Sequence, residues 1–187
     1  MPEDLIQSLE KIHYYALLAS DTINSILAIE RMVIPYYLLE DTVNVLQTTE
    51  KAYKLYQKYG YDRRAAGVYP TAIYVSLLNK NFSRARRYMD IFENSSGLFD
   101  EEGNIINGRE HYYNSRGLYY LGVGKLDSAE YWFRKLASYG HALDAHKGIL
   151  SVYEQCKNND SILKYVSLTE RSLGEWAGRQ QADAIIQ

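Results

Sequence analysis

The side chains best suited to chemistry are thinly spread along this chain. Its four histidines are His13, His111, His141 and His146. His141 and His146 are five residues apart, which puts them on different faces of a helix, and no cysteine or carboxylate completes a zinc set beside them. The sequence therefore predicts no metal site and no cofactor, and it favours surface or capping roles for these histidines.

Two short motifs resemble parts of catalytic or phosphate-binding sequences. Ser161–Lys164 matches S-x-x-K, a serine-nucleophile motif, but the companion motifs S-D-N and K-T-G are absent. Gly122–Lys125 suggests a phosphate loop, but it lacks the earlier glycine and the following serine or threonine. Because Ser161 follows Asp160 at a predicted helix start, and glycines suit turns, both motifs are interpreted as features of helix ends.

An acidic, glycine-containing stretch offers the strongest enzymatic alternative. Asp100, Glu101 and Glu102 precede His111 and could supply acid and base groups to a hydrolase or transferase that uses the loop 95–111. The ligand spacing of a calcium loop is absent from 100–104. Nothing in the sequence holds these carboxylates as a fixed pair, so we expect a protein that is not an enzyme.

A basic cluster consists of Arg84, Arg86 and Arg87, with Lys80 nearby. Its simplest interpretation is a solvated helix face, and its functional interpretation is a contact with an acidic patch on a partner. The chain also contains 19 tyrosines. Most of these should fill space between helices with the hydroxyl reaching water or a carbonyl, and some should line a binding surface.

Composition limits the class of protein. Hydrophobic residues make up 47% and charged residues 24%, a balance that can support a folded core over the 187 residues. The net charge of −2 argues against binding to nucleic acid. The single cysteine, Cys156, excludes an intrachain disulfide. No stretch is long and apolar enough for a membrane span, and Met1–Asp4 does not begin a signal peptide.

An internal repeat gives the strongest indication of the fold. The clearest block is GLYYLGVGKLDSAEYWF, residues 117–133, in which Gly117 and Ala129 allow two antiparallel helices to approach. Tyr120 and Phe133 then fill the surrounding space, and Gly124 lies at the turn. The alanine position recurs at Ala52, Ala85, Ala129 and Ile162, and the large position one turn later recurs at Tyr56, Met89, Phe133 and Val166.

The spacing of the alanine position supports a true repeat. The steps from Ala52 to Ala85 and from Ala129 to Ile162 are equal, and each is close to the ~34 residues typical of repeated helix pairs. The step from Ala85 to Ala129 is longer. It predicts an insertion in the glycine-rich stretch after Ser95, after which the register is restored.

Hydrophobic periodicity predicts an almost entirely helical chain. The segment 37–59 is long enough to be two helices with a bend near Asp41–Thr42. The helices expected lie near 4–18, 21–33, 37–59, 63–79, 83–94, 109–122, 127–139, 142–156, 160–172 and 174–186. Asp127, followed by Glu130, is interpreted as a helix cap, with Ser83 and Asp160 in the same position of their repeats.

The block 117–133 resembles a tetratricopeptide repeat, a family of stacked antiparallel helix pairs. This resemblance implies an all-α superhelix, an α-α solenoid of about four repeats with terminal capping helices, in a single domain over 1–187. The parts expected are a capping pair at 1–35, two divergent repeats at 36–94, an inserted loop at 95–108, two clearer repeats at 109–172 and a final helix at 173–187.

The resemblance also implies function, because such repeats bind a protein or an extended peptide in the concave groove formed by the first helix of each pair. By register, the groove residues expected are Tyr74, Leu77, His111, Asn114, Leu118, Lys147 and Ser151. The tyrosine-rich helices, KLDSAEYWFRK and FDEEGNI look like the repeat regions of bacterial membrane-anchored sensors and regulators. That likeness implies a sensor or scaffold region outside the cytoplasm, whose final helix continues toward a membrane segment. The alternative is a cytoplasmic receptor for a short signalling peptide.

Overall fold

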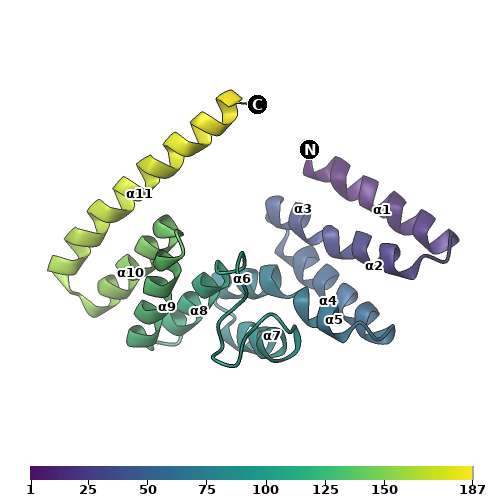
Figure 1. Cartoon of the computed structure of the whole chain (residues 1–187), viewed down its shortest axis with the longest axis horizontal. Helices are drawn as coiled ribbons and strands as arrows, with labels where there is room; N and C mark the ends of the chain where they lie inside the picture. Colours follow the sequence, from purple (N-terminus) through teal and green to yellow (C-terminus); the bar gives the residue numbers. More distant parts are fainter. Residues whose placement is uncertain (187) are drawn as a thin grey trace. The chain divides into compact units, whose positions relative to one another are not determined.

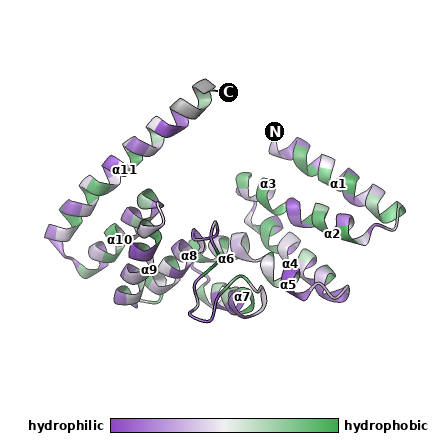
Figure 2. Ribbon diagram, viewed as in Figure 1, coloured by the Kyte–Doolittle hydropathy of each residue, from purple (hydrophilic) through white to green (hydrophobic). Residues whose placement is uncertain are grey.

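A computed structural model describes residues 1–186, which are helices and loops with no β-strand (Figure 1). Most of the helices carry both hydrophobic and hydrophilic residues (Figure 2). The all-α prediction is therefore confirmed for this part of the chain. The helices are α1 (Pro2–Leu18), α2 (Thr22–Arg31), α3 (Val33–Leu38), α4 (Thr42–Lys58), α5 (Asp62–Gly67), α6 (Pro70–Leu78), α7 (Phe82–Ser95), α8 (Tyr112–Gly122), α9 (Leu126–Ser138), α10 (Ala142–Cys156) and α11 (Asn159–Ile186).

Most connections between the helices are the same tight turn. In the first of them, Ser20 has a φ of +57°, its N–H bonds to Leu17 O, and the N–H of Asp21 bonds to Ala16 O. This is a Schellman ending, and Asp21 is also the N-cap of the next helix. The same pair of bonds recurs where the positive φ falls at Glu40, Gly60, Lys80, Gly124 and Lys157.

These turns impose a regular spacing on the first half of the chain. The left-handed positions there are Ser20, Glu40, Gly60 and Lys80, so successive turns are evenly spaced. The side chain one helical turn after the cap that follows each of these turns is buried. Val45 in α4 and Ala85 in α7 are two examples. The caps Asp41 of α4 and Asn81 of α7 are therefore equivalent positions of a repeating helix pair.

Two breaks within this regular pattern occur at prolines. Pro35 cannot donate the helical bond to the carbonyl of Arg31, and α2 ends at Arg31. Pro70 likewise has no N–H, and α5 ends at Gly67 before α6 begins at Pro70. The helix predicted at 63–79 is therefore two segments. The bend considered near Asp41 is confirmed, because α3 ends at Leu38 and α4 begins at Thr42.

The chain divides into two compact units, Met1–Asn104 and Ile105 onward, which we call the N-terminal and C-terminal units. The boundary lies in the loop between α7 and α8, where the sequence predicts the insertion. In this loop Asp100 accepts hydrogen bonds from the backbone N–H (2.6 Å) and side-chain amide (2.9 Å) of Asn104.

The C-terminal unit packs α8, α9, α10 and α11 in sequence. Its centre is Phe133 of α9, a fully buried ring with Gly117 of α8 and Gly148 of α10 against it. A Cβ atom built on either glycine would lie less than 3.0 Å from a ring carbon, closer than real Cβ atoms approach. The expected close approach at Gly117 is therefore confirmed, and Gly148 makes a second one that the sequence pattern did not predict.

The last helix differs from the prediction of two helices at 160–172 and 174–186. Residues 159–186 form one continuous helix, α11, because Gly174 has no left-handed φ and no turn follows it. His146 Nδ1 lies 2.9 Å from Ser172 Oγ and ties α11 to α10. From Leu173 to Gln181 the side chains of α11 are exposed. Residue 187 lies outside the described residues.

The predicted helix caps are wrong by two positions. Lys125, not Asp127, is the N-cap of α9, and it makes no side-chain cap bond. Asn81 and Asn158 take the cap position instead of Ser83 and Asp160, and each accepts from a backbone N–H. The cause is the preceding turn, since the residue after a left-handed Schellman position becomes the next cap whatever its side chain.

Replacing Lys80 by glycine should stabilise the protein by about 0.5–1 kcal/mol, because an L-residue with positive φ is strained and glycine is not. Lys80 has a φ of +55°. Gly60→Ala is the matched reverse change, since Gly60 has a φ of +76° at the equivalent turn and no atom lies near its Cβ position. Chemical denaturation should show changes of opposite sign in the free energy of unfolding of the two variants. A loss of stability in Lys80→Gly would contradict the strained backbone conformation assigned to Lys80.

Candidate functional site

An open groove of about 830 Å³ lies between α4 and α7 in the N-terminal unit. Its α4 side is one face of the helix, with residues spaced by three or four along the chain. Three residues of α7 form the opposite side. The lining residues are Val43, Leu46, Gln47, Glu50, Lys51, Lys54 and Leu55 from α4 and Arg84, Arg87 and Tyr88 from α7.

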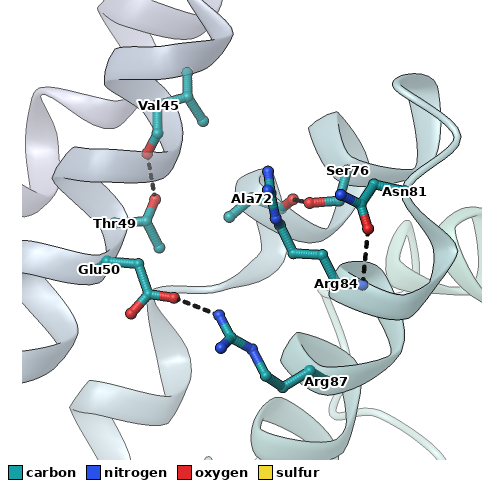
Figure 3. A network of polar contacts seen from close by, with 8 residues as sticks. All are labelled: Val45, Thr49, Glu50, Ala72, Ser76, Asn81, Arg84 and Arg87. Carbon is teal, nitrogen blue, oxygen red and sulfur yellow. Dashed lines mark hydrogen bonds and ion pairs between the residues drawn. The ribbon is translucent and has the colours of Figure 1, made fainter.

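The groove exists because its two helices share a support rather than packing closely against each other. Both α4 and α7 pack on α5 and α6. The face of α4 opposite the groove is buried and carries Val45, Thr49, Ala52 and Tyr56. Side-chain bonds to carbonyls one turn earlier satisfy Thr49 and Ser76, at 2.8 Å and 2.7 Å, so neither hydroxyl needs a partner in the groove (Figure 3).

The groove is strongly basic in a protein of slightly negative net charge. Lys51, Lys54, Arg84 and Arg87 line it, and Glu50 is the acidic residue among its lining. The sequence-predicted basic cluster is thus split: Arg84 and Arg87 face the groove, whereas Arg86 pairs with Asp90 on its own helix. The α4 half of the basic surface was not predicted.

An ion pair bridges the groove. Arg87 Nη2 lies 2.9 Å from Glu50 Oε1 (Figure 3). The Arg87 guanidinium also lies 4.9 Å from the centre of the Tyr88 ring, a cation–π arrangement. The pKa of Tyr88 is raised by burial and then by hydrogen bonding to Glu50. Arg87 is therefore held by contacts on two sides, one with a carboxylate and one with a ring.

Three tyrosine rings, each in contact with the next, support the α7 side of the groove. Tyr69 is buried and lies in the short connection between α5 and α6. Its ring stacks on that of Tyr88, with ring centres 4.5 Å apart and an interplanar angle of 20°. Tyr53 of α4 lies on Tyr69 at 5.1 Å. Burial, followed by the charge of Glu50, raises the pKa of Tyr69. The stack thus connects α4 and α7 beneath the ion pair.

The seven residues predicted to line a concave groove are not those that line the α4–α7 groove. Leu77 is 5% exposed and Asn114 6%, so both are core residues. Tyr74 is half-buried, with its ring 6.2 Å from that of Tyr37, and Leu118 packs on the core around Phe133. Tyr74 and Leu77 belong to the N-terminal unit, and the other five residues belong to the C-terminal unit.

Two of the other predicted residues, His111 and Lys147, lie near one carboxylate in the C-terminal unit, that of Asp144. His111 Nε2 lies 3.1 Å from Asp144 Oδ2. This hydrogen bond is the main reason that the pKa of Asp144 is lowered, and the charge of Lys147 contributes. Lys147 is exposed and Ser151 half-buried on the same helix. Contact of any of these residues with a ligand stays a prediction.

The groups considered for catalysis have structural partners or are exposed. Asp100 closes its own loop, and Glu101 and Glu102 are exposed. His111 is paired with Asp144. Among the residues that the structure describes, no group of three or more histidine, cysteine, aspartate or glutamate side chains could hold a metal ion. None of the helices described is long and apolar enough to cross a membrane.

No known family model, curated protein or solved structure matches the chain. The stacking of successive helices is compatible with a helical repeat. The groove between α4 and α7, with its four basic side chains, is the strongest candidate for a functional site.

Proposed function

We propose that this protein is a non-catalytic binding module of the tetratricopeptide type, which binds a polypeptide segment in the groove between α4 and α7. The observation that carries the proposal is the groove lining. Apolar side chains of α4 such as Leu46 and Leu55 lie beside long charged ones from α4 and α7, two helices that are not consecutive in the chain. Such a mixed surface gives apolar contact area together with polar groups that fix orientation.

The dimensions of the groove favour a chain over a small molecule. Val43 and Leu55 mark its ends on α4, and a helix rises by about 18 Å between two such positions. An extended peptide covers that length with about five or six residues at ~3.3 Å each. The groove is also open along its length, whereas small-molecule sites bury most of the ligand surface.

The helix packing supports the repeat assignment. Antiparallel neighbours joined by tight turns, and small residues such as Gly117 and Ala129 at the helix contacts, are what a stack of helix pairs requires. The step from Asp41 to Asn81, the caps of α4 and α7, is longer than the ~34 residues usual for this repeat. The resemblance to bacterial sensor regions further suggests a sensor or scaffold role in a larger signalling protein.

A site-specific crosslink tests the proposal. A benzophenone amino acid placed at Gln47 lies in the groove, and the same change at Gln57 lies outside it on the same helix. Three fluorescein-labelled 12-residue peptides that alternate leucine with glutamate, glutamine or lysine serve as probes. We expect light-dependent crosslinking of at least one peptide at position 47 and not at 57. Failure of all three at 47, or equal yields at both positions, rejects the groove as a peptide site.

A further inference from the structure

We propose that the occupant of the groove is an acidic polypeptide segment, and that Glu50 is an internal competitor which this segment displaces from Arg87. The inference rests on the proposed function and adds the chemistry of the partner. Its basis is the arrangement of charges: four cationic side chains line the groove beside one carboxylate.

The cations form two rows that face each other. Lys51 and Lys54 are one turn apart on α4, and Arg84 and Arg87 are one turn apart on α7. Within the described chain only Arg87 of these four has a carboxylate partner. An extended peptide directs successive side chains to opposite sides. Carboxylates on such a peptide can therefore meet both rows, while Leu46 and Leu55 contact its apolar side chains.

Glu50 occupies the place that a partner carboxylate would take. It projects from α4 to Arg87 across the groove, and its side chain is 27% exposed whereas that of Arg87 is 63% exposed (Figure 3). The guanidinium is therefore accessible to a second carboxylate. A second contact, with the Tyr88 ring on its own helix, also holds Arg87 in the groove.

Exchange of one carboxylate for another at Arg87 changes the free energy little, because the guanidinium keeps one ion pair in either state and its own side chain is largely exposed. The remaining effect of Glu50 on an acidic ligand is repulsion and competition, so Glu50 lowers affinity and selects ligands with several carboxylates. If Glu50 only held α4 to α7, its removal would have the opposite effect on affinity, because the groove would widen and every ligand would bind more weakly.

Fluorescence anisotropy with the full chain separates these roles. The probes are the glutamate, glutamine and lysine peptides, with a 12-nucleotide single-stranded DNA as a second polyanion. At about 50 mM salt we expect the glutamate peptide to bind at least about tenfold more tightly than the glutamine peptide, and the difference to shrink at about 300 mM salt. Glu50→Gln should strengthen binding of the glutamate peptide by about three- to tenfold and leave the glutamine peptide unchanged.

The controls keep the charge change equal. Glu102→Gln changes the net charge by the same amount as Glu50→Gln but lies in an exposed loop. It should leave the affinities for the glutamate and glutamine peptides within about twofold of those of the unmodified protein. Arg87→Gln should weaken binding of the glutamate peptide, and circular dichroism checks that each variant is folded. Equal affinity for the glutamate and glutamine peptides, or tighter binding of the lysine peptide or DNA, overturns the acidic-segment proposal while crosslinking at position 47 still supports a peptide groove. Weaker glutamate-peptide binding by Glu50→Gln overturns the competitor role.

Discussion

Replacing Phe133 by alanine is expected to lower the free energy of unfolding of the C-terminal unit by about 3–5 kcal/mol. The ring is fully buried at the centre of that unit, with α8 on one side and α10 on the other. Its removal leaves a cavity that the two helix backbones cannot fill without moving together. Urea denaturation followed by circular dichroism measures the loss; a change below about 1 kcal/mol would mean that the ring is not the central contact.

A double-mutant cycle checks the geometry of the same contact. Gly148→Ala alone should destabilise the unit by about 1–3 kcal/mol, because its Cβ would lie less than 3.0 Å from carbons of the Phe133 ring. In the Phe133→Ala background the added methyl enters the cavity, so the same change should be neutral or stabilising. Gly174→Ala in exposed α11 is the control, and it should stabilise by up to about 1 kcal/mol through helix propensity. Additive effects of Gly148→Ala and Phe133→Ala would contradict the packing.

The packing around Phe133 was predictable because close approach leaves a trace in the sequence. Gly117 and Ala129 are small where two helices meet, and Phe133 is large one turn after Ala129. The equivalence of Ala85 and Ala129 is also confirmed, since each lies one turn after its helix cap. Spacing and side-chain volume are direct consequences of this packing, and both are visible without coordinates.

The predicted repeat register is wrong in α4, and the error has a physical reason. Ala52 was aligned with Ala85, but the residue of α4 in the position of Ala85 is Val45. The error is nearly two turns of helix, so Ala52 and Val45 lie on the same buried face. Burial alone cannot distinguish two such positions. The caps that distinguish them follow the left-handed turn residues Glu40 and Lys80, which are not glycines and give little signal in a sequence.

The groove was only half visible in the sequence. Arg84 and Arg87 belonged to a recognisable basic cluster, but Arg86 in the same cluster faces away from the groove. Lys51 and Lys54 lie on α4, well before α7 in the chain, and only the shared support of α5 and α6 brings the two rows together. The step between the caps of α4 and α7 is longer than the step from Ala52 to Ala85, so the predicted alignment of the two helices did not place Lys51 and Lys54 opposite Arg84 and Arg87.

Replacing Tyr69 by alanine should lower the free energy of unfolding of the N-terminal unit by about 3–5 kcal/mol, the range for loss of a large buried aromatic ring. Tyr69 is 1% exposed at the break between α5 and α6; its ring stacks on that of Tyr88 and contacts that of Tyr53 at a tilt. Because Tyr88 lines the groove, the same change should also weaken peptide binding. Denaturation and anisotropy on the one variant measure both effects.

Tyr59→Ala is the matched control, since it removes the same side chain at a position that is 48% exposed, and it should change stability by no more than about 0.5 kcal/mol. Peptide binding by Tyr59→Ala should be unchanged. A Tyr69→Ala protein that loses stability but keeps full affinity would show that the α7 wall needs no aromatic support. Loss of both would connect the groove to the break at Pro70, because the residue that packs behind Tyr88 is the one that directly precedes that proline.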